Sequence, residues 1–213
     1  MLFRSAFLVD ELGRRVREEG LRIVGIPTSD RTQEHARRLN IPLSTFAEHT
    51  QIDLTIDGAD EVELRTLNLI KGHGGALLRE KIVAAASKRM AVVVDQTKLV
   101  RKLGSIFAVP VEVVPFGWQV TQGKLQRLKA KTTLRMGPAN EPYVTDGGHY
   151  IIDCAFGPMK DPREIARELD RVVGVVEHGL FLGLASQVFV GGSERVEILK
   201  KKLPRRPLHA ARN

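Results

Sequence analysis

Three short polar segments contain residue types that suit acid–base chemistry and the binding of an anion. The first is Asp57-Gly58-Ala59-Asp60, in which two carboxylates flank a glycine directly after an apolar run. Carboxylates in this arrangement suit the binding of hydroxyl groups or the transfer of a proton. The same spacing is also typical of an ordinary capped turn, so the segment alone leaves both interpretations open.

The second segment, Lys71-Gly72-His73-Gly74-Gly75, leads into a predicted helix that contains Glu80. Glycines let backbone amides approach an anion, and the N-terminus of a helix attracts negative charge. Lys71 adds a cation at the loop entrance, and beside it Glu80 becomes a candidate base. The loop lacks the Gly-Lys-Ser/Thr ending of a nucleotide loop and the spacing of the dinucleotide fingerprint.

The third segment is Asp95-Gln96-Thr97-Lys98, which follows an apolar, β-branched run. Lys98 is able to bind a phosphate as a point charge, although a lysine in such a place is more often a surface residue. The chain carries a net charge of +8, of which residues 194–213 contribute +5 and residues 1–193 only +3. A positive balance favours an anionic substrate such as a phosphate ester.

The elements that must position these segments alternate between strands and helices. Apolar runs predict strands over 21–26, 52–56 and 90–94, and helical periodicity covers 6–19, 31–39 and 76–88. This alternation indicates a parallel sheet covered by helices, and ligands bind such sheets at the carboxyl ends of the strands. The turn Pro27-Thr28-Ser29-Asp30 has the chemistry of a helix N-cap.

The pattern changes after residue 105, where extended segments over 109–114, 132–136, 143–145 and 150–155 mix with helices over 119–128 and 162–172. We therefore predict an α/β fold, with a Rossmann-like parallel sheet core and a small α+β (ferredoxin-like) lid domain. The predicted boundaries are 1–105 for the catalytic core, 106–174 for the lid, 175–193 for the return to the core and 194–213 for a basic tail.

Composition excludes several classes of protein. The 213 residues are 43% hydrophobic and 27% charged, as in globular proteins, and no apolar run is long enough to span a membrane. The start of the chain has no secretory signal, so we expect a cytoplasmic protein with no membrane partner. The single cysteine, Cys154, excludes an internal disulfide and a multi-cysteine zinc site, and the histidines show no metal-ligand spacing. We predict no metal.

The basic tail gives the one argument for a nucleic-acid partner. Residues 194–213 hold seven basic side chains against two acidic ones. A nucleic-acid footprint is usually spread over a folded face and interleaved with aromatic side chains, and this tail has none. We therefore interpret it as a solvated, partly disordered tail and do not expect a nucleic-acid partner.

Read together, the segments resemble the A type of ribose-5-phosphate isomerase. The resemblance covers residues 7 to 193 and rests on Pro27-Thr28-Ser29, D-G-A-D-E from Asp57, K-G-H-G-G-A-L-L-R-E-K from Lys71, V-D-Q-T-K ending at Lys98, V-P-V-E-V from Val109, V-T-D-G-G-H-Y-I-I-D from Val144 and G-V-V-E-H-G-L-F from Gly174. Each motif alone is modest, but their common order is specific.

The resemblance implies an aldose–ketose isomerase that interconverts D-ribose 5-phosphate and D-ribulose 5-phosphate in the non-oxidative pentose phosphate pathway. It implies proton transfer through an enediolate without metal or cofactor, a sugar phosphate as the small-molecule partner, and a homodimer or homotetramer. The catalytic residues would be Glu80 as the base, Lys71 opposite the oxyanion and Asp57. The substrate-binding residues would be Thr28, Ser29, Asp57, Gly58, Ala59, Asp60, Lys71, Gly72, His73, Gly74 and, at the 5-phosphate, Lys98.

The sequence departs from the family pattern in two places. The family normally begins with a helix, a strand and a G-T-G-S-T loop that wraps the phosphate, and these have no counterpart before Ser5. The alternative is therefore a truncated, weakly active or inactive sugar-phosphate-binding homologue, with the natural start upstream. His73 stands where the family usually has glycine, and it would be strained at positive φ. For His178, within the family-like stretch, we expect a structural hydrogen bond.

Overall fold

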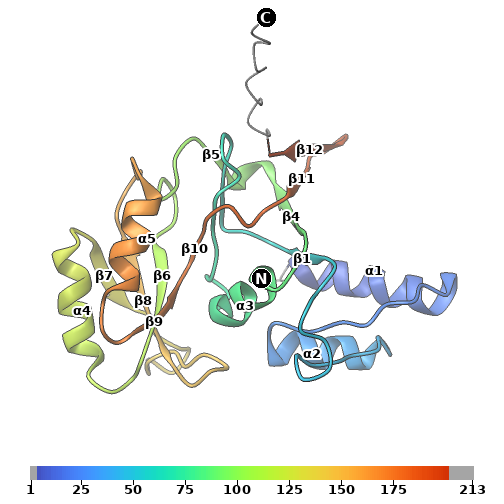
Figure 1. Ribbon diagram of the computed structural model, residues 1–213, viewed down its shortest axis with the longest axis horizontal. Helices are drawn as coiled ribbons and strands as arrows, with labels where there is room; N and C mark the ends of the chain where they lie inside the picture. Colours follow the sequence, from blue (N-terminus) through green and yellow to red (C-terminus); the bar gives the residue numbers. More distant parts are fainter. Residues whose placement is uncertain (1–3, 202–213) are drawn as a thin grey trace, which may run out of the picture.

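The computed structural model describes residues 4–201 and combines a central, mostly parallel sheet with a separate antiparallel sheet, shown at the left of Figure 1. The α-helices are α1 (Arg4–Glu19), α2 (Asp30–Arg38), α3 (Leu77–Ala85), α4 (Trp118–Arg127) and α5 (Pro162–Asp170). None of the helices in this range is long and apolar enough to cross a membrane.

The central sheet contains the strands that carry two of the polar segments. Its order is β1 (Thr55–Asp57), β4 (Met90–Asp95), β11 (Gln187–Gly191) and β12 (Val196–Lys200). β4 runs parallel to both β1 and β11, whereas β12 is antiparallel to β11. Because β1 and β4 are parallel, the segments that begin at Asp57 and Asp95 leave the same edge of the sheet.

A second, smaller sheet borders all three polar segments. Its order is β10 (Leu180–Phe181), β3 (Leu69–Ile70), β2 (Glu61–Glu63) and β5 (Leu99–Val100). β2 begins directly after Asp60, β3 ends directly before Lys71, and β5 begins directly after Lys98. We call these strands the bracing sheet, because their hydrogen bonds connect the ends of segments that lie far apart in the sequence.

The remaining elements form an α+β unit that we call the lid. Its antiparallel sheet has the order β7 (Lys131–Leu134), β8 (Tyr150–Ala155), β6 (Val109–Val113) and β9 (Val175–His178). Buried residues of α4 and α5, including Leu125 and Leu169, share one apolar cluster with this sheet. Cys154 is buried in that cluster, and burial raises the pKa of its thiol to about 12. The fold prediction is confirmed, while the division at residues 105 and 174 stays a prediction.

Three expected elements differ in the structure. Residues 21–26 form only an isolated bridge between Gly25 and Leu43, and Leu21 and Val24 are exposed. No other described strand pairs with this segment, so its apolar side chains lack the cover of a sheet. Residues 143–145 form no strand, and the first part of the predicted tail forms β12. The tail beyond Lys201 lies outside the described residues.

Candidate active site

The structure brings together the three side chains predicted to be catalytic. The Lys71 ammonium lies 2.9 Å from Oδ2 of Asp57 and 3.1 Å from Oε2 of Glu80, and it donates a 2.8 Å hydrogen bond to the carbonyl oxygen of Gly58. The side chains of Lys71, Asp57 and Glu80 are 4%, 16% and 14% exposed. A buried ammonium therefore stands between two nearly buried carboxylates.

Each of the three residues is fixed by the element that carries it. Asp57 ends β1, and Glu80 lies in the first turn of α3, whose Leu77, Val83 and Ala84 are buried. Lys71 follows β3 and its backbone N–H donates to the carbonyl oxygen of Gly179 at 2.9 Å. A Cβ atom on Gly179 would lie 2.1 Å from the Lys71 carbonyl oxygen, so this close approach requires glycine.

Burial shapes the proton affinity of the site. Burial raises the pKa of Glu80 to about 7, and the nearby charge of Asp57 adds to the increase, while Lys71 opposes it. Burial disfavours the charged form of Lys71, but the carboxylates of Asp57 and Glu80 outweigh that cost and raise the pKa of the ammonium above its usual value. Glu80 is thus able to accept and return a proton near neutral pH, whereas Lys71 stays charged.

The carboxylate oxygens that face Lys71 still lack a well-aligned hydrogen-bond donor. Oδ2 of Asp57 and Oε2 of Glu80 are buried and lie within ion-pair distance of the ammonium, yet neither has a hydrogen bond of good geometry in the described structure. A buried acceptor without a well-aligned donor is costly unless a ligand satisfies it.

The glycine-rich loop connects Lys71 to α3. Its positive φ angles fall on Gly72 (+109°) and Gly75 (+87°), so His73 avoids the strain considered from the sequence. The His73 N–H donates a 3.0 Å hydrogen bond to Oδ2 of Asp60, and its ring packs edge-on against Phe107 with centroids 4.7 Å apart. The loop therefore meets the Asp60 end of the first polar segment.

Lys98 contacts the same aromatic ring. Its ammonium is 4.5 Å from the centroid of Phe107. It closes the 3-10 turn η1 (Gln96–Lys98), which is capped by Asp95 through a 2.7 Å hydrogen bond from the Thr97 N–H. Phe107 therefore contacts both His73 and Lys98, and it connects the predicted phosphate-binding lysine to the glycine-rich loop.

Glu61 holds Phe107 in place, and sequence reasoning missed both residues. The Glu61 side chain accepts hydrogen bonds from the N–H groups of Gly104 (2.7 Å), Ile106 (2.6 Å) and Phe107 (2.7 Å). Glu61 is fully buried. The acidic type of Glu61, next to the apolar Val62, was the sequence signal for this role, because a carboxylate in a buried strand needs several hydrogen-bond donors.

Thr28 and Ser29 lie beside the site but make no contact with its charged centre among the described residues. The Ser29 hydroxyl accepts a hydrogen bond from the Thr32 N–H at 3.1 Å and caps α2. The next residue, Asp30, forms a 2.7 Å ion pair with Arg79, the neighbour of Glu80. The capping interpretation is confirmed, while a substrate-binding role for these two residues stays a prediction.

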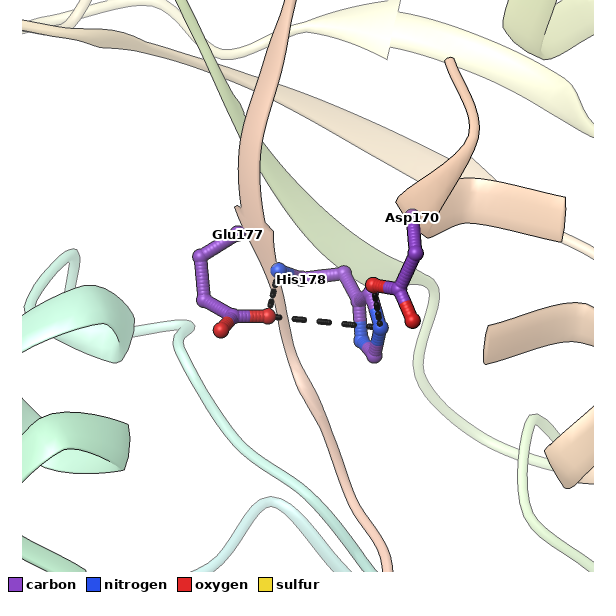
Figure 2. Close-up of side chains that lie close together, drawn as sticks. All are labelled: Asp170, Glu177 and His178. Atoms are coloured by element: carbon purple, nitrogen blue, oxygen red, sulfur yellow. Dashed lines mark hydrogen bonds and ion pairs between the residues drawn. The ribbon is translucent and has the colours of Figure 1, made fainter. Parts of the chain in front are cut away.

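A second polar cluster, drawn in Figure 2, joins Asp170, Glu177 and His178. Potential metal-ligand atoms of these residues lie within 4.8 Å of one another. However, Nε2 of His178 lies 3.1 Å from Oδ1 of Asp170, and Nδ1 accepts a 3.2 Å hydrogen bond from the Leu180 N–H. Both ring nitrogens are thus already engaged, and burial lowers the pKa of His178 to about 4.

Lys81 also argues against a cation at this cluster. Its ammonium lies 2.6 Å from Oε1 of Glu177 and 2.6 Å from the carbonyl oxygen of His178. A metal ion would meet a positive charge that already occupies the same carboxylate. The arrangement fits the structural hydrogen bond predicted for His178, and it packs α3 against β9.

The fold and site define an α/β protein with a buried acid–base centre, and comparison with known proteins gives its family. Residues 24–195 match the family model of ribose 5-phosphate isomerase A (phosphoriboisomerase A). Curated relatives called ribose-5-phosphate isomerase A include one from Gloeobacter violaceus, 56% identical over 92% of this chain and 84% of its own. Another, from Synechococcus sp. strain JA-3-3Ab, is 49% identical over 92% of this chain and 86% of its own.

Solved structures similar to this chain belong to the same family. Ribose 5-phosphate isomerase A from Methanocaldococcus jannaschii superposes with a TM-score of 0.89 at 40% identity, covering 94% of this chain and 88% of that one. A D-ribose-5-phosphate isomerase in complex with phospho-erythronic acid also gives 0.89, at 38% identity over 92% of this chain and 86% of its own. The chain belongs to the ribose 5-phosphate isomerase A family.

Proposed function

We propose that this aldose–ketose isomerase interconverts D-ribose 5-phosphate and D-ribulose 5-phosphate, and that Glu80 carries the proton between C2 and C1. The observation that carries the proposal is the position of Glu80, a nearly buried carboxylate 3.1 Å from the Lys71 ammonium. Its pKa of about 7 matches a group that must both take up and release a proton. The relative that binds phospho-erythronic acid supports a phosphorylated sugar as the ligand.

The proposed reaction uses one carboxylate and one ammonium. Ionised Glu80 removes the proton from C2 of the open-chain aldose, and the electron pair moves toward the C1 carbonyl to give an enediolate. Lys71 stabilises the negative charge that develops on oxygen. Protonated Glu80 then returns the proton to C1 while the C2 oxygen becomes the carbonyl and its proton passes to the C1 oxygen. No atom is gained or lost.

The remaining predicted residues would bind and orient the sugar. Asp57 and Asp60 are proposed to accept hydrogen bonds from substrate hydroxyl groups, and one of them to assist ring opening. Gly58, Ala59, Gly72, His73 and Gly74 form the backbone around these carboxylates and Lys71. Thr28 and Ser29, which precede the Asp30 partner of Arg79, are proposed to contact the substrate. No step of this reaction uses a metal or a cofactor.

Isomerisation in deuterium oxide tests the proposal. The purified chain, with a chelator present, should convert ribose 5-phosphate to ribulose 5-phosphate that carries deuterium at C1, because the proton held by Glu80 exchanges with solvent. Carbon-bound deuterium is read by NMR. Deuterium at C1 would exclude a hydride shift, whereas product without deuterium fits either a hydride shift or a proton that Glu80 returns before it exchanges. Absence of product would favour the weakly active or inactive alternative, which no observation on this chain supports.

The pH dependence of turnover should follow the ionisation of Glu80. The raised pKa means that the base form is lost as the pH falls through about 7, so kcat/KM should decrease below that pH. The substrate phosphate also titrates, near about 6, and phosphorus NMR measures that step separately. If the decrease of kcat/KM at low pH followed only the titration of the phosphate, Glu80 would not be the base.

Lys98→Met should mainly weaken substrate binding. A charge-assisted contact contributes about 1.5–3 kcal/mol, so KM for ribose 5-phosphate should rise roughly 10- to 100-fold with little change in kcat. Steady-state kinetics with ribose 5-phosphate and with unphosphorylated ribose measure the effect, which should be confined to the phosphorylated sugar. Lys160→Met, at an exposed lid position, is the control. An unchanged KM would remove Lys98 from the phosphate site.

Two further predictions from the sequence are kept as proposals. The family supports assembly as a homodimer or homotetramer, which light scattering of the purified chain would measure. A cytoplasmic location fits an enzyme that acts on a sugar phosphate and would be tested by cell fractionation. A nucleic-acid partner is not proposed.

A further inference from the structure

Arg135, a side chain of the lid, forms hydrogen bonds to the glycine-rich loop. Arg135 follows β7, and its Nη1 donates hydrogen bonds to the carbonyl oxygens of Gly72 (2.8 Å) and His73 (3.2 Å). The opposite edge of the guanidinium forms a bidentate pair with Asp153 of β8, including a 3.0 Å bond from Nε to Oδ2. The Arg135 side chain is only 14% exposed.

Arg135 is itself fixed within the lid. Its N–H donates to the carbonyl oxygen of Ile151 at 2.8 Å, and its carbonyl oxygen accepts from the Tyr143 N–H at 2.9 Å. Bidentate pairing with a carboxylate orients the planar guanidinium, which a flexible ammonium does not match. The donors that reach the loop are therefore held in a defined direction.

Tyr143 contacts the other end of the same loop. A Cβ atom built on Gly75 would lie 2.1 Å from the Tyr143 hydroxyl oxygen, so the phenol lies directly against this glycine. Burial raises the pKa of the phenol, which keeps it neutral. Arg135 and Tyr143 thus hold the loop at both ends, and their backbones are hydrogen-bonded to each other.

The geometry of the peptide unit shows what this contact does. In a planar trans peptide, the carbonyl oxygen and the following N–H point in opposite directions. The Gly72 carbonyl oxygen faces Arg135, and the N–H of the same peptide unit, on His73, donates to Asp60. The His73 carbonyl oxygen also accepts from Arg135, so the Gly74 N–H is turned away from the guanidinium.

We propose that Arg135 is a positioning residue for the isomerase reaction. By holding two successive carbonyl oxygens, it keeps the His73 N–H on Asp60 and presents the Gly74 N–H, which is turned away from the guanidinium, to the anionic intermediate. It also fixes the loop that begins at Lys71. The proposal deepens the proposed function and rests on it. Asp57, Lys71 and Glu80 belong to the core, but in this proposal a residue of the lid fixes the loop that leads from Lys71 to the helix of Glu80.

Arg135→Met tests this role in the full chain, with Arg163→Met, an exposed arginine of α5, as the matched control. Misplacing groups that stabilise a transition state lowers kcat by roughly 10- to 100-fold, and KM should change much less. Arg135→Lys should recover only part of the loss, because an ammonium cannot keep the bidentate pair and both carbonyl contacts. A folded Arg135→Met variant with kcat within twofold of the control would overturn the proposal.

Ligand binding separates positioning from a general structural effect. Phospho-erythronic acid carries a carboxylate where the intermediate carries its charge, so Arg135→Met should weaken its binding at least about tenfold more than it weakens binding of ribose 5-phosphate. Equal losses for both ligands would contradict the proposal. If Arg135→Met does not fold, Asp153→Asn carries the same test, because it preserves shape and loosens only the guanidinium.

The two proposals fail differently. If Glu80 is not the base, Glu80→Gln retains turnover, whatever the Arg135 variants do. If Arg135 does not position the loop, its variants either behave like the control or lose binding of both ligands equally, while Glu80→Gln is inactive.

Discussion

Glu80→Gln should lower kcat by about 10⁴-fold while ribose 5-phosphate still binds with an affinity within about threefold of the original. General acid–base catalysis contributes up to this factor, and here one group is proposed to perform both proton transfers. Glutamine has the same shape but cannot take up the proton from C2. The loss should therefore appear in kcat and in the exchange of deuterium into the substrate.

The fold should tolerate this substitution. A group whose pKa is raised in the folded state contributes stability that is present below its unfolded pKa of about 4.5 and lost as the pH rises through about 7. The neutral amide avoids the cost of the buried charge at pH 8, and Lys71 keeps Asp57 as a partner at 2.9 Å. The variant should thus be at least as stable as the original at that pH.

Calorimetric titration with ribose 5-phosphate and a turnover assay measure the two effects side by side. Glu164→Gln, at an exposed position of α5, is the matched control and should retain full activity. Turnover by Glu80→Gln above about a tenth of the control rate would show that another group is the base.

Lys71→Met should lower both activity and stability. Without the ammonium, two nearly buried carboxylates face each other with no cation between them. Removing one partner of a buried ion pair costs about 3–5 kcal/mol, because the remaining charges stay desolvated. Like-charge repulsion would raise the pKa of Glu80 further, so the base would be protonated at neutral pH. Loss of the charge opposite the oxyanion should lower kcat by about 10³-fold.

The pH dependence of unfolding tests this interpretation. The raised pKa of Glu80 means that this carboxyl is protonated at pH 5 and tends to ionise at pH 8, so Lys71→Met should be less stable at pH 8 than at pH 5. Denaturant unfolding at both pH values measures the difference. Lys88→Met removes a lysine from an exposed pair with Asp53 and should change stability by less than about 0.5 kcal/mol. Equal destabilisation at both pH values would contradict unpaired carboxylates as the cause.

Sequence reasoning predicted that Asp57, Lys71 and Glu80 act together, but its reason holds only for Asp57, which ends a strand of the parallel sheet. Lys71 follows β3, which pairs antiparallel with β2 and β10. Sequence reasoning also predicted the change to an antiparallel α+β unit after residue 105, since hairpin and helix signals interrupt the earlier alternation. These are local patterns. In each of them, the residues that define an element lie within a few positions of one another.

The supporting contacts could not be predicted in the same way. Arg135 lies 63 positions from Gly72, and Glu61 lies 46 positions from Phe107. A single sequence shows that a residue is charged but not which distant backbone groups it reaches. The prediction of a buried strand over 21–26 was wrong for a related reason, because an apolar run becomes a strand only where another strand pairs with it.

The bracing sheet limits how enzymes of this architecture can change their loops. β2 pairs with β3 through Glu61↔Ile70 and Val62↔Leu69, and with β5 through Val62↔Leu99. A residue inserted within one of these strands would move its buried side chains to the opposite face. Insertions and deletions in this architecture should therefore be confined to the residues between these strands, and a change of length within β2, β3 or β5 should disrupt the site.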